Sequence, residues 1–330
     1  MKPSTSFGIV QVSKREPHLT RVLVFVITWN VMSIIYSKQS WGSACCARSS
    51  AAPSLILSDD QSQLGLALSH GNVVAQADDE GAAIFGFPNT SEIIRTYRLD
   101  GATLLSDRFQ VGASVSIVQH SVAQPEILDS TIGAGDTRFS FAYEFLPLWS
   151  YSAWKPQGFI FSVITVPTGR SVYEAQAPTS SDVVGNGFYS ISVGTILQKR
   201  WTNWDVFLMP ELHYSLPRTF ENSGMVFQVV PGFGGSMGVG GGISPGGSNF
   251  RIGSRVQPRI DQSRSIPAID SESQVQLGTA TCDVAFDLSY LFGSSDSLML
   301  SYADQTLLGP AMNSNLSRIF GVNFQHRWER

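Results

Sequence analysis

The clearest pattern in the chain is an alternation of apolar and polar positions with a period of two. Aromatic residues occupy every second position of residues 138–145, and polar or small residues lie between them. Residues 282–292 and 320–328 alternate in the same way. Because successive side chains of a β-strand point to opposite faces, this pattern predicts strands with one apolar and one polar face. Helical periodicity is almost absent after Pro53.

The pattern predicts about twelve strands, an even number, as single-chain bacterial membrane barrels have. They are residues 63–74, 92–105, 109–120, 137–145, 158–167, 187–199, 204–214, 233–243, 250–258, 277–292, 297–305 and 316–328.

The connections between these strands alternate in length. Short links at 106–108, 200–203, 244–249 and 293–296 alternate with long polar links, and residues 146–157 are the one exception. The long links are residues 75–91, 121–136, 168–186, 215–232, 260–276 and 306–315. A membrane barrel has short turns at one rim and long loops at the other, whereas a soluble sandwich has no reason to sort its loops. We therefore predict an all-β, up-and-down antiparallel transmembrane β-barrel.

The N-terminus has the features of an export signal. Basic residues precede an apolar run of about 14 residues, Val22 to Ile35, and the small-residue stretch Ser40 to Ala44 follows it. This order is typical of a secretory signal, and the run is shorter than the roughly 20 residues of a membrane-spanning helix. We predict an export and processing region at 1–47, a lead-in at 48–62 and the barrel at 63–330, with the bacterial outer membrane as the destination.

Composition narrows the function classes. Charged residues make up 15% of the chain, and the net charge is −4. Without the predicted signal the balance is more acidic, which argues against a nucleic-acid partner. Three cysteines, Cys45, Cys46 and Cys282, are too few for a disulfide scaffold or a cysteine metal site. We expect no cofactor and no metal.

Aromatic residues gather near the ends of the predicted strands. Amphipathic rings favour the boundary between membrane and water, so these residues predict contacts with outer-membrane lipid. The set is Trp149, Trp154, Trp201, Trp204, Tyr214 and Trp328. The last strand also predicts handling by the barrel-insertion machinery, although Glu329 and Arg330 follow its final aromatic residue.

Polar residues on the opposite strand faces are the candidates for a wet lumen. A charge in mid-strand is costly toward lipid and acceptable toward water. The candidates for lining a solute pathway are Arg138, Glu144, Glu211, His213, Asp283, Asp287, Asn323, Gln325 and Arg327. Asp283 and Asp287 are too far apart along one strand to act as a carboxylate pair, and they line the lumen or pair with Arg138 and Arg327.

Several short motifs resemble a known family. The stretch from Gly133 to Asp136, the sequence from Val166 to Arg170, residues 302–309 and residues 325–328 resemble the outer-membrane transporters linked to phenol-degradation pathways. The resemblance extends over about residues 53–330. It implies a barrel that passes small molecules, including hydrophobic ones, across an outer membrane.

Two functions from different classes remain open. The first is a channel or transporter for a small solute, and the second is a non-conducting structural or surface-interaction barrel that works through its long loops. Enzyme activity is not expected. The pairs His120–Ser121 and Ser69–His70 lie at strand ends beside mobile loops, and with many serines and few histidines such adjacency is expected by chance.

Overall fold

The computed structural model describes residues 54–57, 60–86, 90–148, 152–222, 224–266, 274–309 and 311–330. The predicted export region, most of the lead-in and Trp149 lie outside these residues.

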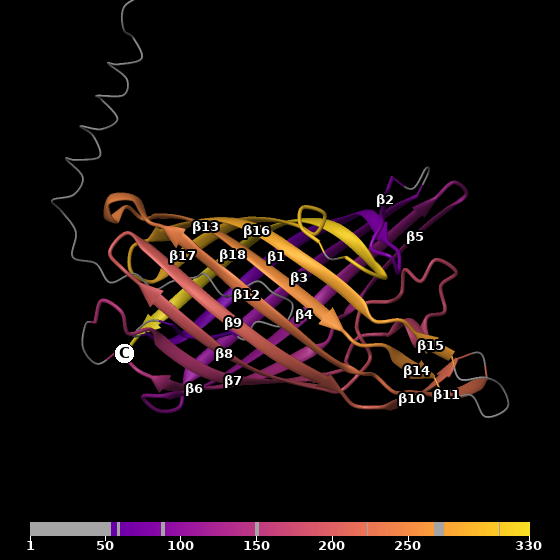
Figure 1. The fold of residues 1–330 in the computed structure, drawn as a ribbon, viewed down its shortest axis with the longest axis horizontal. Coiled ribbons are helices and arrows are strands. Elements are labelled where there is room, and N and C mark those ends of the chain that lie inside the picture. Colours follow the sequence, from indigo (N-terminus) through magenta and orange to yellow (C-terminus); the bar gives the residue numbers. More distant parts are fainter. Residues whose placement is uncertain are drawn as a thin grey trace, which may run out of the picture. The chain divides into compact units, whose positions relative to one another are not determined.

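Twelve long strands form one antiparallel sheet that closes on itself through β1 and β18 (Figure 1). Within the barrel each strand pairs with its neighbours in chain order, so the topology is up-and-down. The strands are β1 (Asp60–Ala77), β3 (Ser91–Leu104), β4 (Phe109–Gln124), β6 (Thr137–Leu146), β7 (Gln157–Val166), β8 (Ser190–Arg200), β9 (Trp204–Ser215), β12 (Phe233–Ile243), β13 (Phe250–Asp261), β16 (Thr279–Phe292), β17 (Asp296–Asp304) and β18 (Ser314–Glu329). All twelve predicted strands are present, and the predicted fold class is confirmed.

The short and long connections sort to opposite ends of the barrel (Figure 1). The long connections carry strands that were predicted as loops. Five of them have only three to five residues, too few to show an alternation, and the eight-residue β5 has no regular alternation of apolar and polar residues. They are β2 (Ala83–Phe85), β5 (Ile127–Ala134), β10 (Arg218–Asn222), β11 (Met225–Val229), β14 (Arg264–Ile266) and β15 (Gln274–Gln276). The described residues also include two single turns of 3-10 helix, η2 (Val172–Glu174) and η3 (Pro245–Gly247).

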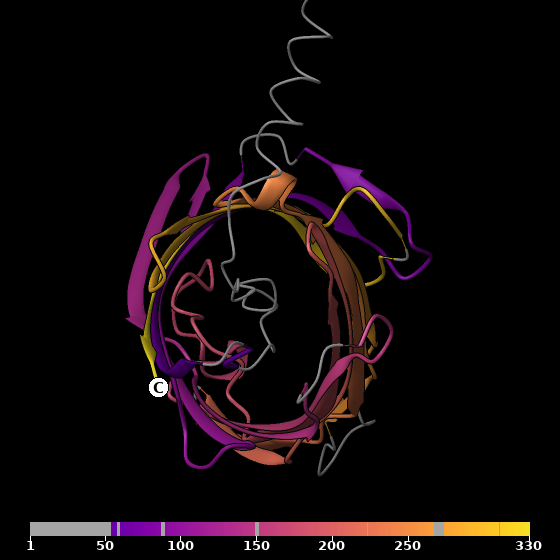
Figure 2. The same ribbon diagram turned by 90° about the vertical axis from the view of Figure 1, so that its left-hand side faces the viewer.

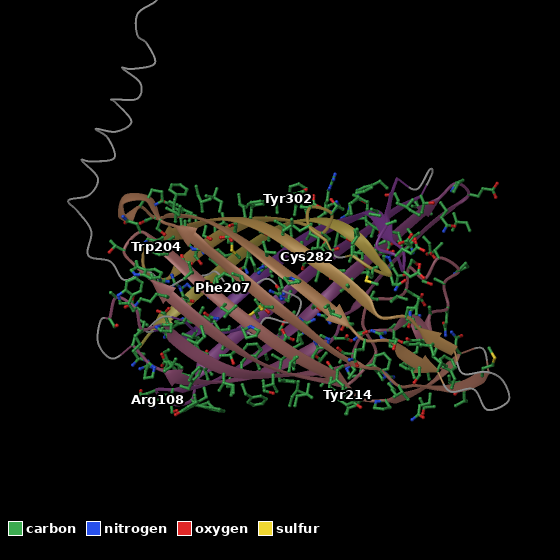
Figure 3. All side chains as sticks on the ribbon, viewed as in Figure 1. Arg108, Trp204, Phe207, Tyr214, Cys282 and Tyr302 are labelled. Carbon is green, nitrogen blue, oxygen red and sulfur yellow. The ribbon has the colours of Figure 1, made fainter. Side chains whose placement is uncertain are left out.

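The outer face of the barrel is apolar. Carbon-rich side chains cover the outside of the strands (Figure 3). Large hydrophobic residues are exposed on every barrel strand, for example Phe141, Val193, Leu300 and Phe320. Closure pairs the backbone groups of the strands with one another, as hydrocarbon requires. This surface is that of a barrel that crosses a membrane.

Two prolines interrupt the ladder of the barrel wall. The pairing of β8 with β9 skips two positions beside Pro210, and the pairing of β12 with β13 skips two positions beside Pro258. Proline has no N–H to donate, so a ladder breaks where its nitrogen faces a neighbouring strand. The predicted strand 250–258 ends at Pro258, whereas β13 continues to Asp261 through its pairing with β16. The extension carries Arg259 and Asp261 into the barrel wall.

The long connection between β7 and β8 folds into the ring of strands (Figure 2). Tyr173 and Phe188 from this segment, residues 167–189, pack with Phe220 and Val229 of the β10–β11 hairpin. Gly187 adopts a φ of 80°, and a Cβ at this position would collide with the Ser171 side chain. The tight fit at a positive φ requires glycine there.

Candidate functional site in the barrel lumen

All nine predicted lumen residues lie on the inward faces of their strands. On β6, β9, β16 and β18 they alternate with exposed apolar residues such as Phe139, Leu212, Phe286 and Phe324. The strand parity deduced from the sequence therefore matches the structure. Their role in a solute pathway remains a prediction.

Four of the nine residues meet at one polar cavity of about 330 Å³. Arg138 comes from β6, Glu211 and His213 from β9, and Asp283 from β16. The cavity also takes in residues that the sequence analysis did not single out, mainly Arg259, Asp261, Gln262, Arg264 and Gln305. We call it the polar cavity.

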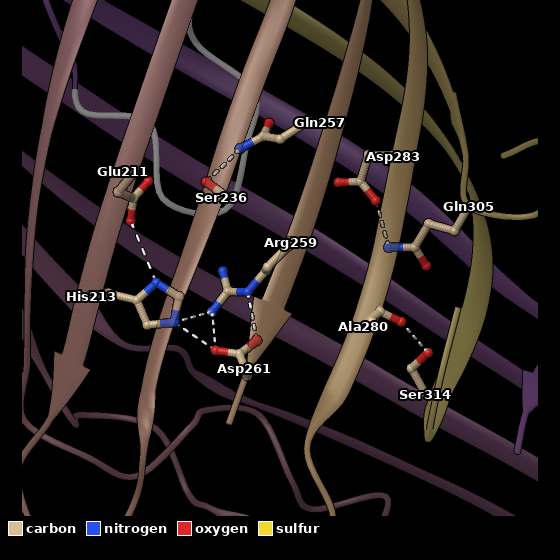
Figure 4. Close-up of polar contacts among 10 residues, drawn as sticks. All are labelled: Glu211, His213, Ser236, Gln257, Arg259, Asp261, Ala280, Asp283, Gln305 and Ser314. Carbon is tan, nitrogen blue, oxygen red and sulfur yellow. Dashed lines mark hydrogen bonds and ion pairs between the residues drawn. The ribbon is translucent and has the colours of Figure 1, made fainter. Parts of the chain in front are cut away.

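One wall of the polar cavity is a tight triad of side chains (Figure 4). His213 Nε2 lies 2.5 Å from Asp261 Oδ1, and Arg259 donates from Nε to Asp261 Oδ2 at 2.8 Å. Arg259 also reaches Asp261 Oδ1 at 3.2 Å. The short contact between His213 and Asp261 places a proton on Nε2, because an ionised carboxylate can only accept. Asp261 thereby holds both the imidazole and the guanidinium in place.

Glu211 stands beside this triad and is almost fully buried, at 3% exposure. Its Oε1 lies 3.9 Å from His213 Nδ1, which is an ion-pair distance and not a hydrogen bond (Figure 4). Across the cavity, Asp283 accepts a hydrogen bond of 2.8 Å from Gln305 Nε2.

A second charged cluster lies nearer the short-turn end. Arg251 donates to both oxygens of Asp205, at 2.8 and 2.9 Å, and to Asp287 at 2.6 Å. All three side chains are at most 15% exposed. The partner of Asp287 is thus Arg251, and neither Asp283 nor Asp287 has the Arg138 or Arg327 partner considered from the sequence.

The other predicted lumen residues lie away from the polar cavity. Glu144 accepts a hydrogen bond of 2.7 Å from Gln157 and lines a separate cavity of about 540 Å³. Asn323 is buried, Gln325 donates to Gln63 at 2.6 Å, and Arg327 lies 3.6 Å from Asp60.

The lumen also contains an apolar surface, which the sequence analysis did not predict. Its members are inward-facing residues of four adjacent strands, and we call them the apolar wall: Ala142, Phe159, Phe161, Val163, Ile196, Phe207 and Met209. Leu55 and Leu57 of the lead-in pack on this surface. Gln110 fixes the lead-in by bonding both the N–H and the carbonyl of Ile56, at 2.7 and 3.3 Å.

Some of the lumen residues that were not predicted could have been found from the sequence pattern. Once Glu211 and His213 are assigned to the inner face, parity places Phe207 and Met209 there too, since alternate residues of a strand share a face. Arg259 and Asp261 were missed because the predicted strand ended at Pro258. Leu55 and Leu57 precede the first strand, and no local pattern indicates that they enter the lumen.

The aromatic residues predicted for the membrane interface lie near the ends of strands or are exposed. Trp204 and Tyr214 lie at opposite ends of β9 (Figure 3), and Trp201 stacks on Trp204 with ring centres 3.8 Å apart. Trp154 is 85% exposed and Trp328 is 46% exposed. Their place at the boundary of the membrane stays a prediction.

The 167–189 segment is held together by its own polar contacts and reaches the wall at His120. Asp182 accepts hydrogen bonds of 2.8 Å from Arg170 Nη1 and from the backbone N–H of Gln176. Burial raises the pKa of this loop carboxyl, but the hydrogen bonds outweigh burial and hold the pKa below its ordinary value. His120 of β4 contacts the carbonyl oxygen of Val183 at 3.1 Å. The segment therefore has an ordered, docked conformation.

Comparison with solved structures identifies the fold. The crystal structure of the COG4313 outer membrane channel from Pseudomonas putida F1 matches with a TM-score of 0.60 and 11% identity, over 86% of this chain and 100% of that one. This chain has the fold of an outer-membrane channel. This fold is the one expected for the predicted location in the bacterial outer membrane, and the family resemblance is confirmed at the level of the fold.

Two further structures are less similar. The CymD monoaromatic hydrocarbon channel has a TM-score of 0.39 and 11% identity, over 82% of this chain and 90% of that one. The translocator domain of the autotransporter NalP from Neisseria meningitidis has a TM-score of 0.40 and 8% identity, over 94% and 96%. No protein-family model and no curated protein matches the sequence.

The described residues contain neither a membrane-spanning helix nor a metal-binding cluster of side chains. No helix among them is both long and apolar enough to cross a membrane. Within the same residues, no group of three or more His, Cys, Asp or Glu side chains could hold a metal ion.

Proposed function

We propose that this chain is an outer-membrane channel that passes a small, partly hydrophobic solute through its lumen. The observation that carries the proposal is the division of the lumen surface into the apolar wall and the polar cavity, which share Val163. Binding sites for small molecules combine an apolar surface with a few placed polar groups. A solute with an apolar body and a polar group finds both surfaces along one path.

A second candidate is supported by the segments inside the ring. Leu55 and Leu57 cover part of the apolar wall, and residues 167–189 fold into the long-loop end. A lumen occupied in this way also suits a non-conducting barrel that works through its loops.

Single-channel conductance in a planar bilayer separates the two candidates. We expect discrete conductance steps from the refolded chain, and larger steps from a variant with Leu55→Ser and Leu57→Ser, because the polar side chains no longer hold the lead-in on the apolar wall. Asp287→Asn is expected to change the ion selectivity of the steps. A folded barrel that inserts but never conducts, with or without the two serines, would support the non-conducting alternative.

A further inference from the structure

A row of three polar side chains lies on the outer face of the barrel. His70 of β1, Arg95 of β3 and Gln119 of β4 are paired in register across three adjacent strands. They share the outer face with exposed apolar residues of the same strands. We call these three residues the outer polar row. Polar groups on this face require a reason, because most of the face is suited to hydrocarbon.

The outer polar row begins where the apolar surface of these strands ends. Toward the short turns, the next outward residues are Leu68, Tyr97 and Ile117, which are 40–52% exposed. The outward residues after these are also apolar, namely Leu66, Leu99 and Val115. Toward the long loops, the next outward residues on β1 and β4 are polar, Asn72 and Ser121. The row therefore lies at the level of lipid head groups, on the long-loop side, which faces the outside of the cell in bacterial barrels.

Two hydrogen bonds fix the guanidinium of Arg95 within the row. Its Nε donates to Nδ1 of His70, and its Nη1 donates to Oε1 of Gln119, both at 3.3 Å. Because Nδ1 accepts, the imidazole carries its proton on Nε2 and is neutral. Neither partner has a negative charge, and no carboxylate among the described residues forms an ion pair with Arg95. Protein groups in contact with Arg95 therefore leave its positive charge uncompensated.

A neighbouring arginine on the same face is arranged differently. Arg318 of β18 lies diagonally across from His70 and forms an ion pair of 3.0 Å with Asp304. The same carboxylate accepts a hydrogen bond of 2.8 Å from Tyr302. This end of the barrel can thus provide a carboxylate for an outward arginine, and the lack of one at Arg95 is a property of the outer polar row.

The outer polar row has three donor groups left for a ligand. Nη2 of Arg95, Nε2 of His70 and the amide nitrogen of Gln119 form no hydrogen bond with any other described residue. The two hydrogen bonds that hold the guanidinium engage the acceptors of His70 and Gln119, so these two side chains keep their donors. One positive charge surrounded by donors is the chemistry of a phosphate site, for which arginine is especially suited.

The surroundings of the row indicate that the phosphate belongs to a lipid. Leu68, Tyr97 and Ile117 begin directly beside it, so acyl chains attached to a bound phosphate group have an apolar surface to lie against. Basic residues at the edge of a membrane protein's apolar surface bind anionic lipid head groups in this way. In the outer leaflet of a bacterial outer membrane, the phosphate-bearing lipid is lipid A, the anchor of lipopolysaccharide.

We propose that His70, Arg95 and Gln119 form a binding site for a phosphate group of lipid A. Arg95 supplies the charge, and His70 and Gln119 orient the guanidinium and add donors of their own. The site depends on the outer-membrane location and not on conduction, so it goes beyond the proposed channel.

Equilibrium binding to the full chain, refolded in a nonionic detergent so that no lipid A is carried over from cells, tests the site. The probes are lipid A with two phosphates, lipid A with both phosphates removed, and inorganic phosphate. We expect the phosphorylated lipid to bind most tightly, and Arg95→Gln to weaken its binding by roughly tenfold. Arg108→Gln is the matched control and should leave the affinity unchanged. Arg108 is also on the outer surface, but at the short-turn end, where it contacts the Tyr143 hydroxyl at 3.5 Å (Figure 3).

Three results would overturn the assignment: equal binding of the two forms of lipid A, displacement of lipid A by inorganic phosphate at equal concentration, or an equal loss in both glutamine variants. The first two are measured on the unaltered chain, so they decide even if Arg95→Gln does not fold. Phosphate-dependent binding of lipid A without conductance would refute the channel and keep the site. Conductance without such binding would refute the site and keep the channel.

Discussion

Two parts of the lumen wall stabilise their buried side chains in opposite ways, one by apolar packing and one by ion pairing. The apolar wall on β6 to β9 excludes water by packing ring and aliphatic side chains together and by covering them with Leu55 and Leu57. The cluster of Arg251, Asp205 and Asp287 instead pairs each charge at short distance. Both lie on inward faces that the same alternation produces. The alternation decides which side chains face the lumen, and the residue types decide whether that surface is apolar or charged. This lumen is therefore neither a uniform aqueous pore nor a uniform apolar tunnel.

The largest effect is expected where a buried charge loses its partner. Arg251→Leu leaves two carboxylates, Asp205 and Asp287, without their guanidinium, and should lower the free energy of unfolding by about 3–5 kcal/mol. Urea unfolding of the refolded barrel, followed by tryptophan fluorescence, measures the change. Adding Asp205→Asn and Asp287→Asn should recover most of the loss. A loss below about 1 kcal/mol would show that water already reaches this cluster.

A somewhat smaller effect is expected in the apolar wall. Phe161 is 2% exposed and contacts Gly194 of β8, so Phe161→Ala should leave a cavity and cost about 3–4 kcal/mol in the same urea assay. Phe141→Ala is the matched control, because its ring points outward and lipid chains can fill the space. Equal losses in the two variants would contradict the idea that the inner wall is packed.

The smallest effect concerns the docked 167–189 segment. Asp182→Asn should destabilise the folded conformation of this segment by about 1 kcal/mol, because the ion pair between Asp182 and Arg170 inside it is lost. The pKa of Asp182 is held below its ordinary value, so its contribution is present above the ordinary pKa and disappears as the pH falls through the lower, folded value. After correction for the intrinsic exchange rate, which itself slows on acidification, the protection of the amides in residues 170–183 should fall as the pH is lowered in the unaltered chain. It should fall less in the Asn variant, where Asp129, bound to Thr179, still titrates against this segment. Identical pH profiles for the two chains would remove Asp182 from this role.

Much of the fold followed from local pattern, and the exceptions have identifiable causes. All twelve barrel strands were predicted because a period of two persists over enough residues to be recognised. The strand ending at Pro258 was too short by three residues, since proline can remain in a strand where one ladder is interrupted. The β10–β11 hairpin was assigned to a loop because five residues on each side show no clear alternation.

The sequence predicted which side chains of the candidate site face the lumen, but not which side chains they contact. Glu211, His213 and Asp283 were placed in the lumen from parity alone, and the structure brings them to one cavity. Their partners come from other strands, as with Asp261 for His213, and register across strands is not encoded in the alternation.

By itself, the sequence of this protein determined the class of fold, the number of strands, the sorting of short and long connections, and the face on which each strand residue lies. These properties are local, because they depend on side-chain alternation and chain length. The three-dimensional arrangement alone brings Leu55 and Leu57 into the lumen and joins Arg251 to two carboxylates. Those arrangements depend on the closure of the barrel, which brings together residues that are far apart along the chain.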